Sequence, residues 1–219
     1  MADSKNNQVH QDKSMSFADA TAFWNERFDK AEFIFGEEPN KYLVQKATEY
    51  LKPHDKVLCI ADGEGRNGVW LAKQGMQVVG FDASNIALGK AKQFAKDHQV
   101  EVEYSFSDTD SFAWHAETYD AVIAIFIQFA DPAMRERIFQ RTYETLKPGG
   151  IFILQGYTPK QLEYKTGGPS LIEHLYTEEL IRDLTKDFKI LELDTYEQEL
   201  NEGARHAGMS ALLGLVAKK

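Results

Sequence analysis

The stretch VLCIADGEGRNG, residues 57–68, indicates the fold of this chain. Its first four residues are apolar and predict a short strand, which runs into a glycine turn at Gly63 and Gly65. A helix is predicted to start near Asn67, and a second strand follows it and ends in Asp82. This order is typical of a crevice for a nucleoside-containing cofactor, because glycines let the backbone approach the ligand and the acid binds ribose hydroxyls.

Helices and strands alternate around this stretch, up to residue 155. Hydrophobic spacing predicts helices over residues 16–28, 40–51, 67–73, 85–98 and 132–146, and strands over residues 57–60, 77–81, 102–105, 121–126 and 151–155. Alternation of this kind predicts a mostly parallel sheet with helices on both faces.

The pattern changes after Tyr157. A polar loop over 158–170 and a helix over 177–184 precede two long strands, 188–200 and 207–217, which we expect to form an antiparallel hairpin. We therefore predict an α/β fold with three α-β-α layers. Its Rossmann-like sheet is expected to have seven mostly parallel strands and to close with the C-terminal antiparallel hairpin.

Composition narrows the classes of protein to which the chain can belong. The 219 residues carry a formal net charge of −9, and an acidic surface repels nucleic acid and anionic membranes. No apolar run approaches the roughly 20 residues that span a bilayer, and the single cysteine, Cys59, allows no disulfide framework or Cys/His metal site. We expect a single domain over 16–219 after a disordered polar tail over 1–15, in a cytoplasmic protein that binds no nucleic acid, membrane or metal.

Two kinds of cofactor compete for the glycine turn. Residues 63–68 match the G-x-G-x-x-G fingerprint of NAD-binding proteins, a match that is weak by itself. Arg66 and Asn67 would crowd the place of a pyrophosphate, and the hairpin stands where a second mononucleotide-binding half would be needed. Asp108 after the third strand and the LKPGG motif at 146–150 are further nucleoside-type markers, and together they disfavour NAD.

With these motifs in this order, the chain resembles the class I S-adenosylmethionine-dependent methyltransferases. Within that class it looks like the tellurite-resistance and thiopurine-methyltransferase-like branch. The resemblance extends from Phe23 to Lys218 and is carried by FWNERF at 23–28, FGEEPN at 35–40, GEGRN at 63–67, LKPGG at 146–150, YTP at 157–159 and GGP at 167–169. It implies S-adenosylmethionine as cofactor and S-adenosylhomocysteine as product.

The resemblance also implies which residues hold the cofactor. They are Arg27 at its carboxylate, Phe35, Gly36 and Asn40 in an N-terminal lid, Ala61, Asp62, Gly63 and Gly65 under the methionine part, Arg66 and Asn67 directly after that turn, Asp82 and Ala83 at the ribose, Asp108 and Thr109 at the adenine, and Ile125 in the pocket wall. The chain departs from the class at Cys59, where an acid is usual, and at Ala61, where a glycine is usual. Asp62 or Glu64 is expected to supply the missing negative charge near the methionine ammonium.

The activity implied is transfer of a methyl group to a small-molecule acceptor, mainly through alignment of the two reactants. Gln128, Tyr157 and Tyr164 are expected on the acceptor side, and Tyr157 and His206 are the two candidates for a catalytic role. The sequence identifies no general base, which favours a soft sulfur, selenium or tellurium nucleophile as the acceptor. The alternative is a non-catalytic protein that binds or senses S-adenosylmethionine, and the oligomeric state stays open.

Overall fold

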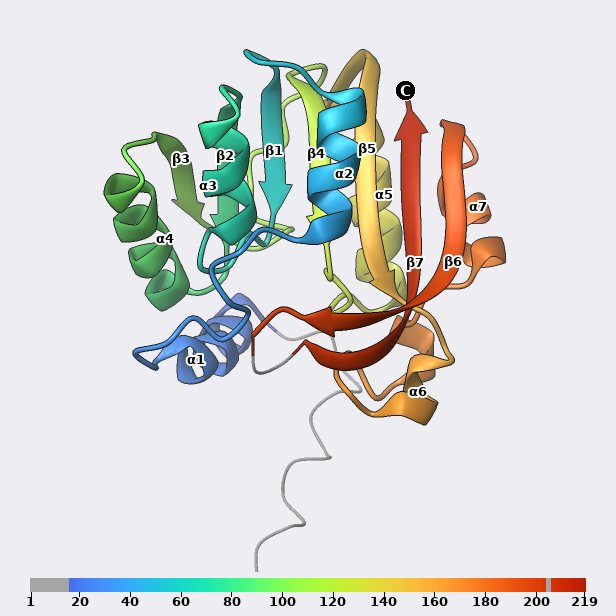
Figure 1. Cartoon of the computed structure of the whole chain (residues 1–219). Helices are drawn as coiled ribbons and strands as arrows, with labels where there is room; N and C mark the ends of the chain where they lie inside the picture. Colours follow the sequence, from blue (N-terminus) through green and yellow to red (C-terminus); the bar gives the residue numbers. More distant parts are fainter. Residues whose placement is uncertain (1–15, 204–205) are drawn as a thin grey trace, which may run out of the picture.

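The computed structural model describes residues 16–203 and 206–219, and Figure 1 shows how their elements are arranged. The predicted tail over 1–15 lies outside these residues. A seven-stranded sheet has the strand order β3-β2-β1-β4-β5-β7-β6. The strands are β1 Lys56–Ile60, β2 Gln77–Asp82, β3 Val102–Phe106, β4 Tyr119–Ile125, β5 Leu146–Tyr157, β6 Lys189–Asn201 and β7 Ala207–Lys218. The pairs among β1 to β5 are parallel and β7 pairs antiparallel with β5 and β6, which confirms the predicted fold.

Helices cover both faces of the sheet. They are α1 Phe17–Phe28, α2 Lys41–Tyr50, α3 Arg66–Lys73, α4 Asn85–Asp97, α5 Pro132–Thr145, α6 Gln161–Tyr164, the short 3-10 helix η1 Ile172–His174, and α7 Glu178–Leu184. In Figure 1, α2 and α3 lie on one face, α5 and α7 lie on the other, and α1 and α6 lie below the sheet. Most of these helices begin where a polar side chain caps a free backbone N–H, at Ser16, Asn40, Ser84, Asp131 and Thr177.

The core is divided by the sheet into two layers. Successive side chains of a strand point to opposite faces, so Leu58 and Ile60 pack in one apolar cluster while Val57 and Cys59 pack in the other. Burial on both faces explains why the strand is apolar throughout. Cys59 is 2% exposed and acts as a small apolar core residue.

The carboxyl ends of the parallel strands share one edge of the sheet, which is the lower edge in Figure 1. The hairpin of β6 and β7 bends beneath this edge, and its turn lies beside the segment that connects α1 with α2. Ligands of open α/β sheets bind at this edge. The fold therefore gathers α1, the glycine turn and the hairpin turn around one region.

Two predicted segments differ from the structure. The strand predicted at 151–155 begins earlier, at Leu146, because Leu146 already pairs with Tyr119 across an irregularity in β4. The segment 158–170, predicted as a loop, contains α6. A helix of four residues is too short to show a helical hydrophobic period, so the sequence pattern could not reveal it.

Candidate active site

The turn between β1 and α3 depends on left-handed backbone conformations. Gly63 has φ 59° and Gly65 has φ 88°, values that glycine adopts without steric cost. Ala61 has φ 49°, in a region that other residues occupy rarely. Ala61 thus adopts a glycine-like conformation at the position where the resemblance leads us to expect glycine.

Two glycines of this motif make room for a buried hydrogen bond. The Tyr104 hydroxyl donates to Asp62 Oδ2 over 2.9 Å, directly behind the turn. A Cβ atom on Gly65 would lie 2.7 Å from that hydroxyl oxygen, and one on Gly68 would collide with Asp62 Oδ2. Gly63 differs from both, because its missing Cβ would face the ring of Phe28 at 3.5 Å. Gly63 therefore faces α1, whereas Gly65 and Gly68 face the interior.

Asp62 in the glycine turn and Asp82 at the end of β2 are both buried, and burial makes both carboxyl groups harder to ionise. Burial raises the pKa of Asp62 to about 7, although bonds from Tyr104 and the Gly68 N–H oppose the rise. Burial likewise raises the pKa of Asp82 to about 6. The two Asp82 oxygens accept from the backbone N–H groups of Gly63, at 2.9 Å, and Ser84, at 2.8 Å. Asp82 thus fixes the glycine turn against the start of α4.

An aromatic segment covers the turn. Phe28 at the end of α1 is 3% exposed and contacts both Trp24 and Phe35, with ring centroids 5.8 Å and 6.1 Å away. Asn25 accepts a bond from the Ser84 hydroxyl at 2.7 Å, which ties α1 to the start of α4. The guanidinium of Arg27 lies 3.3 Å from the centre of the Phe23 ring. The two motifs FWNERF and FGEEPN therefore form one cover over the turn.

Behind this cover lies a buried polar cluster that the sequence patterns did not reveal. Arg66 donates to Glu202 over 2.7 Å, and the Asn40 side-chain amide donates to Glu202 and to Gln155. The Asn40 backbone N–H donates to Asn67 Oδ1 at 2.9 Å. Predicted residues from the lid and from α3 are thus joined to Glu202, in the turn between β6 and β7.

A second, aromatic cluster brings the two candidate catalytic residues together. The His206 ring lies against Phe126, Phe35 and Tyr157, at centroid distances of 4.4, 4.7 and 5.7 Å. Among the described residues, neither His206 Nδ1 nor Tyr157 Oη has a hydrogen-bond partner, and both atoms are buried. Burial lowers the pKa of His206 to about 3 and raises that of Tyr157. Both groups are therefore neutral near pH 7.

Solved structures share this arrangement of elements. One described as "Conversion of a Disulfide Bond into a Thioacetal Group during Echinomycin Biosynthesis" aligns with a TM-score of 0.75 at 15% identity, over 91% of this chain and 92% of that chain. TehB from Haemophilus influenzae aligns with a TM-score of 0.67 at 17% identity, over 92% of this chain and 67% of that chain. At these identities the likeness establishes the fold alone.

Sequence comparison goes further than the fold. Carboxy-S-adenosyl-L-methionine synthase from Desulfotalea psychrophila is 29% identical over 120 residues, which are 52% of this chain and 49% of that protein. The chain spans about half the length of the first curated relatives that it matches. Residues 57–150, with the glycine turn, match the family model of a methyltransferase domain. The part of the chain that holds the glycine turn is therefore similar to S-adenosylmethionine-dependent methyltransferase domains.

The other predicted cofactor residues lie at or just after the carboxyl ends of β2, β3 and β4. Ala83 is half-buried directly after Asp82, and Ile125 is half-buried at the end of β4. Asp108 Oδ1 accepts three bonds, from the N–H groups of residues 110 and 111 and from the Ser111 hydroxyl. Thr109 is 2% exposed. These residues lie along the same sheet edge as Asp82, at the carboxyl ends of β2, β3 and β4.

The residues predicted on the acceptor side have different surroundings. Gln128 is buried, and its amide bonds the backbone N–H and C=O of Tyr157, the latter at 2.9 Å. It also donates to the carbonyl of His174. Tyr164 lies on α6, where its hydroxyl donates to Glu197. Gln128 thus holds the backbone of Tyr157, and Tyr164 lies apart from the aromatic cluster.

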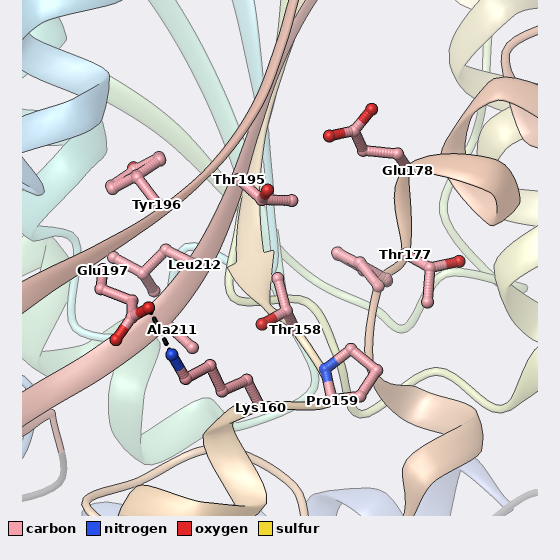
Figure 2. Close-up of a pocket in the computed structure, with 11 residues that line it drawn as sticks. Thr158, Pro159, Lys160, Thr177, Glu178, Thr195, Tyr196, Glu197, Ala211 and Leu212 are labelled. Carbon is pink, nitrogen blue, oxygen red and sulfur yellow. Dashed lines mark hydrogen bonds and ion pairs between the residues drawn. The ribbon is translucent and has the colours of Figure 1, made fainter.

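A pocket of about 360 Å³ lies near Tyr164, between the end of β5, the start of α7 and β6 (Figure 2). Figure 2 shows Thr158 and Thr195 facing this hollow, Tyr196 turned to the other side of β6, and the ion pair of Lys160 with Glu197 at its rim. Tyr196 receives a bond from Gln155, which also contacts Asn40 on the cofactor side. The pocket of Figure 2 and the buried polar cluster therefore lie on opposite faces of the hairpin.

The described residues bear on two other kinds of feature, metal sites and membrane-spanning helices. In residues 16–203 and 206–219, no group of three or more His, Cys, Asp or Glu residues could hold a metal ion. No helix in the same ranges is long and apolar enough to cross a membrane.

Proposed function

We propose that this chain transfers a methyl group from S-adenosylmethionine to a small acceptor molecule. The observation that carries the proposal is the position of Asp82, whose buried carboxylate lies at the end of β2 and holds the Gly63 N–H. A carboxylate accepts hydrogen bonds only, and it has about four lone-pair sites, so it can bind both ribose hydroxyls as well as the backbone.

The other residues around Asp82 fit the rest of the cofactor. Asp108 suits the adenine amino group, because its three intramolecular bonds all fall on Oδ1. Arg27 suits the methionine carboxylate, because a guanidinium forms a planar fork of donors. The remaining cofactor residues in the proposal are Phe35, Gly36, Asn40, Ala61, Asp62, Gly63, Gly65, Arg66, Asn67, Ala83, Thr109 and Ile125.

The bound cofactor supplies a sulfonium methyl group that a nucleophile can displace in line. The chain then has to align the acceptor and keep water out. The cover of Trp24, Phe28 and Phe35 serves the second task, and the aromatic cluster around His206 serves the first. Tyr157 Oη and His206 Nδ1 are buried polar atoms that an acceptor can bond. We propose these two residues for the acceptor side, with Gln128 holding Tyr157. Tyr164, which lies apart from this cluster on α6, is proposed for the acceptor side as well.

We further propose that the acceptor is a soft sulfur, selenium or tellurium nucleophile, in keeping with the tellurite-resistance and thiopurine-methyltransferase-like branch. A general base works best when its pKa is near the operating pH. The lowered pKa of His206, about 3, makes its imidazole a weak base, and Tyr157 stays protonated. An acceptor that is ionised already, or reacts through an unprotonated lone pair, needs no such base. The sulfur chemistry named for the echinomycin structure accords with this choice.

The test has two stages. Calorimetry with S-adenosylmethionine, S-adenosylhomocysteine and NAD measures the cofactor class, and tighter binding of NAD than of either adenosyl ligand would refute the proposal. A methyl-transfer screen then compares tellurite, small thiols, thiopurines, small amines and an RNA pool. Transfer to thiols or tellurite supports the soft acceptor, whereas transfer only to amines or RNA contradicts it. Binding without transfer to any acceptor would instead support a non-catalytic sensor.

A further inference from the structure

Glu202, in the turn between β6 and β7, is more buried than the acids of β6. Its side chain is 5% exposed, and its partner Arg66, at 2.7 Å, is 8% exposed. Two further ion pairs involve β6: Lys160 with Glu197, which are 49% and 43% exposed, and Lys46 with Glu192, which are 9% and 23% exposed. Exposed pairs contribute little, whereas removal of one partner from a buried pair leaves an uncompensated charge. Glu202 therefore has a far larger effect on its surroundings than an ordinary surface acid.

The carboxylate of Glu202 acts on the cofactor side of the site. Arg66 is the first residue of α3 and directly follows the glycine turn. Asn40, the cap of α2, donates to both oxygens of Glu202, at 3.0 and 3.2 Å. Arg66 also donates to the carbonyl of Glu38 in the lid. One carboxylate thus holds the start of α3, the start of α2 and, through Arg66, the lid.

The backbone around Glu202 acts on the acceptor side. The Glu202 N–H donates to the carbonyl of His206 at 2.8 Å. A Cβ atom on Gly203 would lie 2.5 Å from the backbone N of Gly36 and the carbonyl O of Ile34, so the two backbones touch. The turn thereby fixes His206 and the lid relative to each other. The position of the aromatic cluster depends on the same turn that holds Arg66.

We propose that Glu202 is the positioning residue of this site, which keeps the glycine turn, the lid and His206 in one arrangement. This inference rests on the proposed function, because it concerns how the same site is assembled. It assigns the C-terminal hairpin a role in cofactor binding, although the hairpin lies outside the matched residues 57–150.

The test compares Glu202→Gln with Glu199→Gln, an exposed glutamate near the end of β6, the strand that leads into the turn. Affinity for S-adenosylhomocysteine is measured by calorimetry at 15 °C, on protein whose folding is verified by circular dichroism. We expect about a tenfold or greater loss for Glu202→Gln, since a buried Arg66 loses its counter-charge, and no change for Glu199→Gln. If Glu202→Gln does not fold, Glu202→Asp keeps the charge with a shorter reach and has to weaken binding at least threefold.

A second readout follows the acceptor side without any acceptor. NMR of the imidazole nitrogens, assigned with His206→Gln, should show that His206 does not titrate between pH 5 and 8 in the parent protein. In the folded Glu202 variant, displacement of the turn should hydrate the ring and move its pKa toward the ordinary histidine value of about 6.5, against the opposing positive charge of Arg66. Parent protein that fails to bind S-adenosylhomocysteine would refute the proposed function. Parent protein that binds it, with unchanged affinity in the Glu202 variants, would refute only this inference.

Discussion

Tyr104 donates its hydroxyl to Asp62 directly behind the glycine turn, and Gly65 and Gly68 leave the space that this bond occupies. In this chain, packing inside the protein therefore requires two glycines of the G-x-G-x-x-G pattern. Two of its glycines accommodate a tyrosine and a carboxylate, and only Gly63 faces the cover. The sequence pattern that is typical of a pyrophosphate site thus reflects a packing requirement in this chain.

This packing predicts that alanine substitutions at two glycines with nearly the same φ lower the unfolding free energy by different amounts. Gly65 and Gly75 have φ 88° and 87°, so an alanine costs about 1 kcal/mol of conformational strain at either position. Gly65→Ala also meets the Tyr104 hydroxyl at 2.7 Å, whereas Gly75→Ala first meets Pro53 at 3.4 Å. We expect Gly65→Ala to lose a further ~1–3 kcal/mol of unfolding free energy in urea titrations. Tyr104→Phe should recover part of it, and equal losses at both glycines would contradict the interpretation.

The raised pKa of Asp62 predicts that the cofactor-free protein loses stability as pH rises. The folded pKa is about 7 and the unfolded one about 4, so the folded chain holds more protons between these values. The contribution of Asp62 to the unfolding free energy is therefore fully present below about pH 4, and it is lost as the pH rises to about 7. Asp82 adds a decline in the same direction up to about pH 6.

Asp62→Asn should flatten this decline, because the amide stays neutral and can still bond Tyr104 and Gly68. We expect a gain on the order of 1 kcal/mol relative to the parent protein at pH 8, and a smaller one at pH 5. Urea titrations at both pH values measure it. The exposed Asp97→Asn is the control and should keep the parent slope. Parallel profiles for Asp62→Asn and the parent would show that Asp62 is ionised throughout.

Asp82 predicts a specific loss of cofactor affinity. Asp82→Ala removes the proposed ribose acceptor, and we expect weaker binding of S-adenosylhomocysteine by about one to two orders of magnitude, as for bonds to a charged group. Calorimetry measures this change, with Asp97→Ala as the surface control. Unchanged affinity would remove the central residue of the proposed site.

Two buried tyrosines allow a matched test of the acceptor side. Tyr157 and Tyr176 are 1% and 0% exposed, and neither hydroxyl has a partner among the described residues. Loss of an unsatisfied hydroxyl is neutral or stabilising, so both phenylalanine variants should keep or raise the unfolding free energy. Only Tyr157→Phe should lower the methyl-transfer rate, by about tenfold. Equal rates in the two variants would exclude a role for the Tyr157 hydroxyl.

The site residues that could be predicted from local sequence patterns lie at the ends of strands. Asp82 ends β2 and Asp108 comes two residues after β3, and the carboxyl ends of parallel strands meet at one edge, so the sequence alone could place the two acids together. Glu202 and Phe126 carry no such signal. Phe126 is predicted as the last residue of the strand over 121–126, but β4 ends at Ile125 and Phe126 turns away with φ 57°. The bond from Asn40 to Glu202 joins residues 162 positions apart. Contacts of this range depend on the path of the hairpin, which hydrophobic spacing does not encode.

The distance along the chain between Asn40 and Glu202 also sets an order of events during synthesis. The lid emerges early, whereas the residue that anchors it emerges 162 positions later. A long loop must close before such a contact forms, and non-local contacts slow folding. A nascent chain that has completed the glycine turn and Asp82 still lacks Glu202. The site is therefore assembled only after the last two strands have been made, and ligand binding reports completion of the whole sheet.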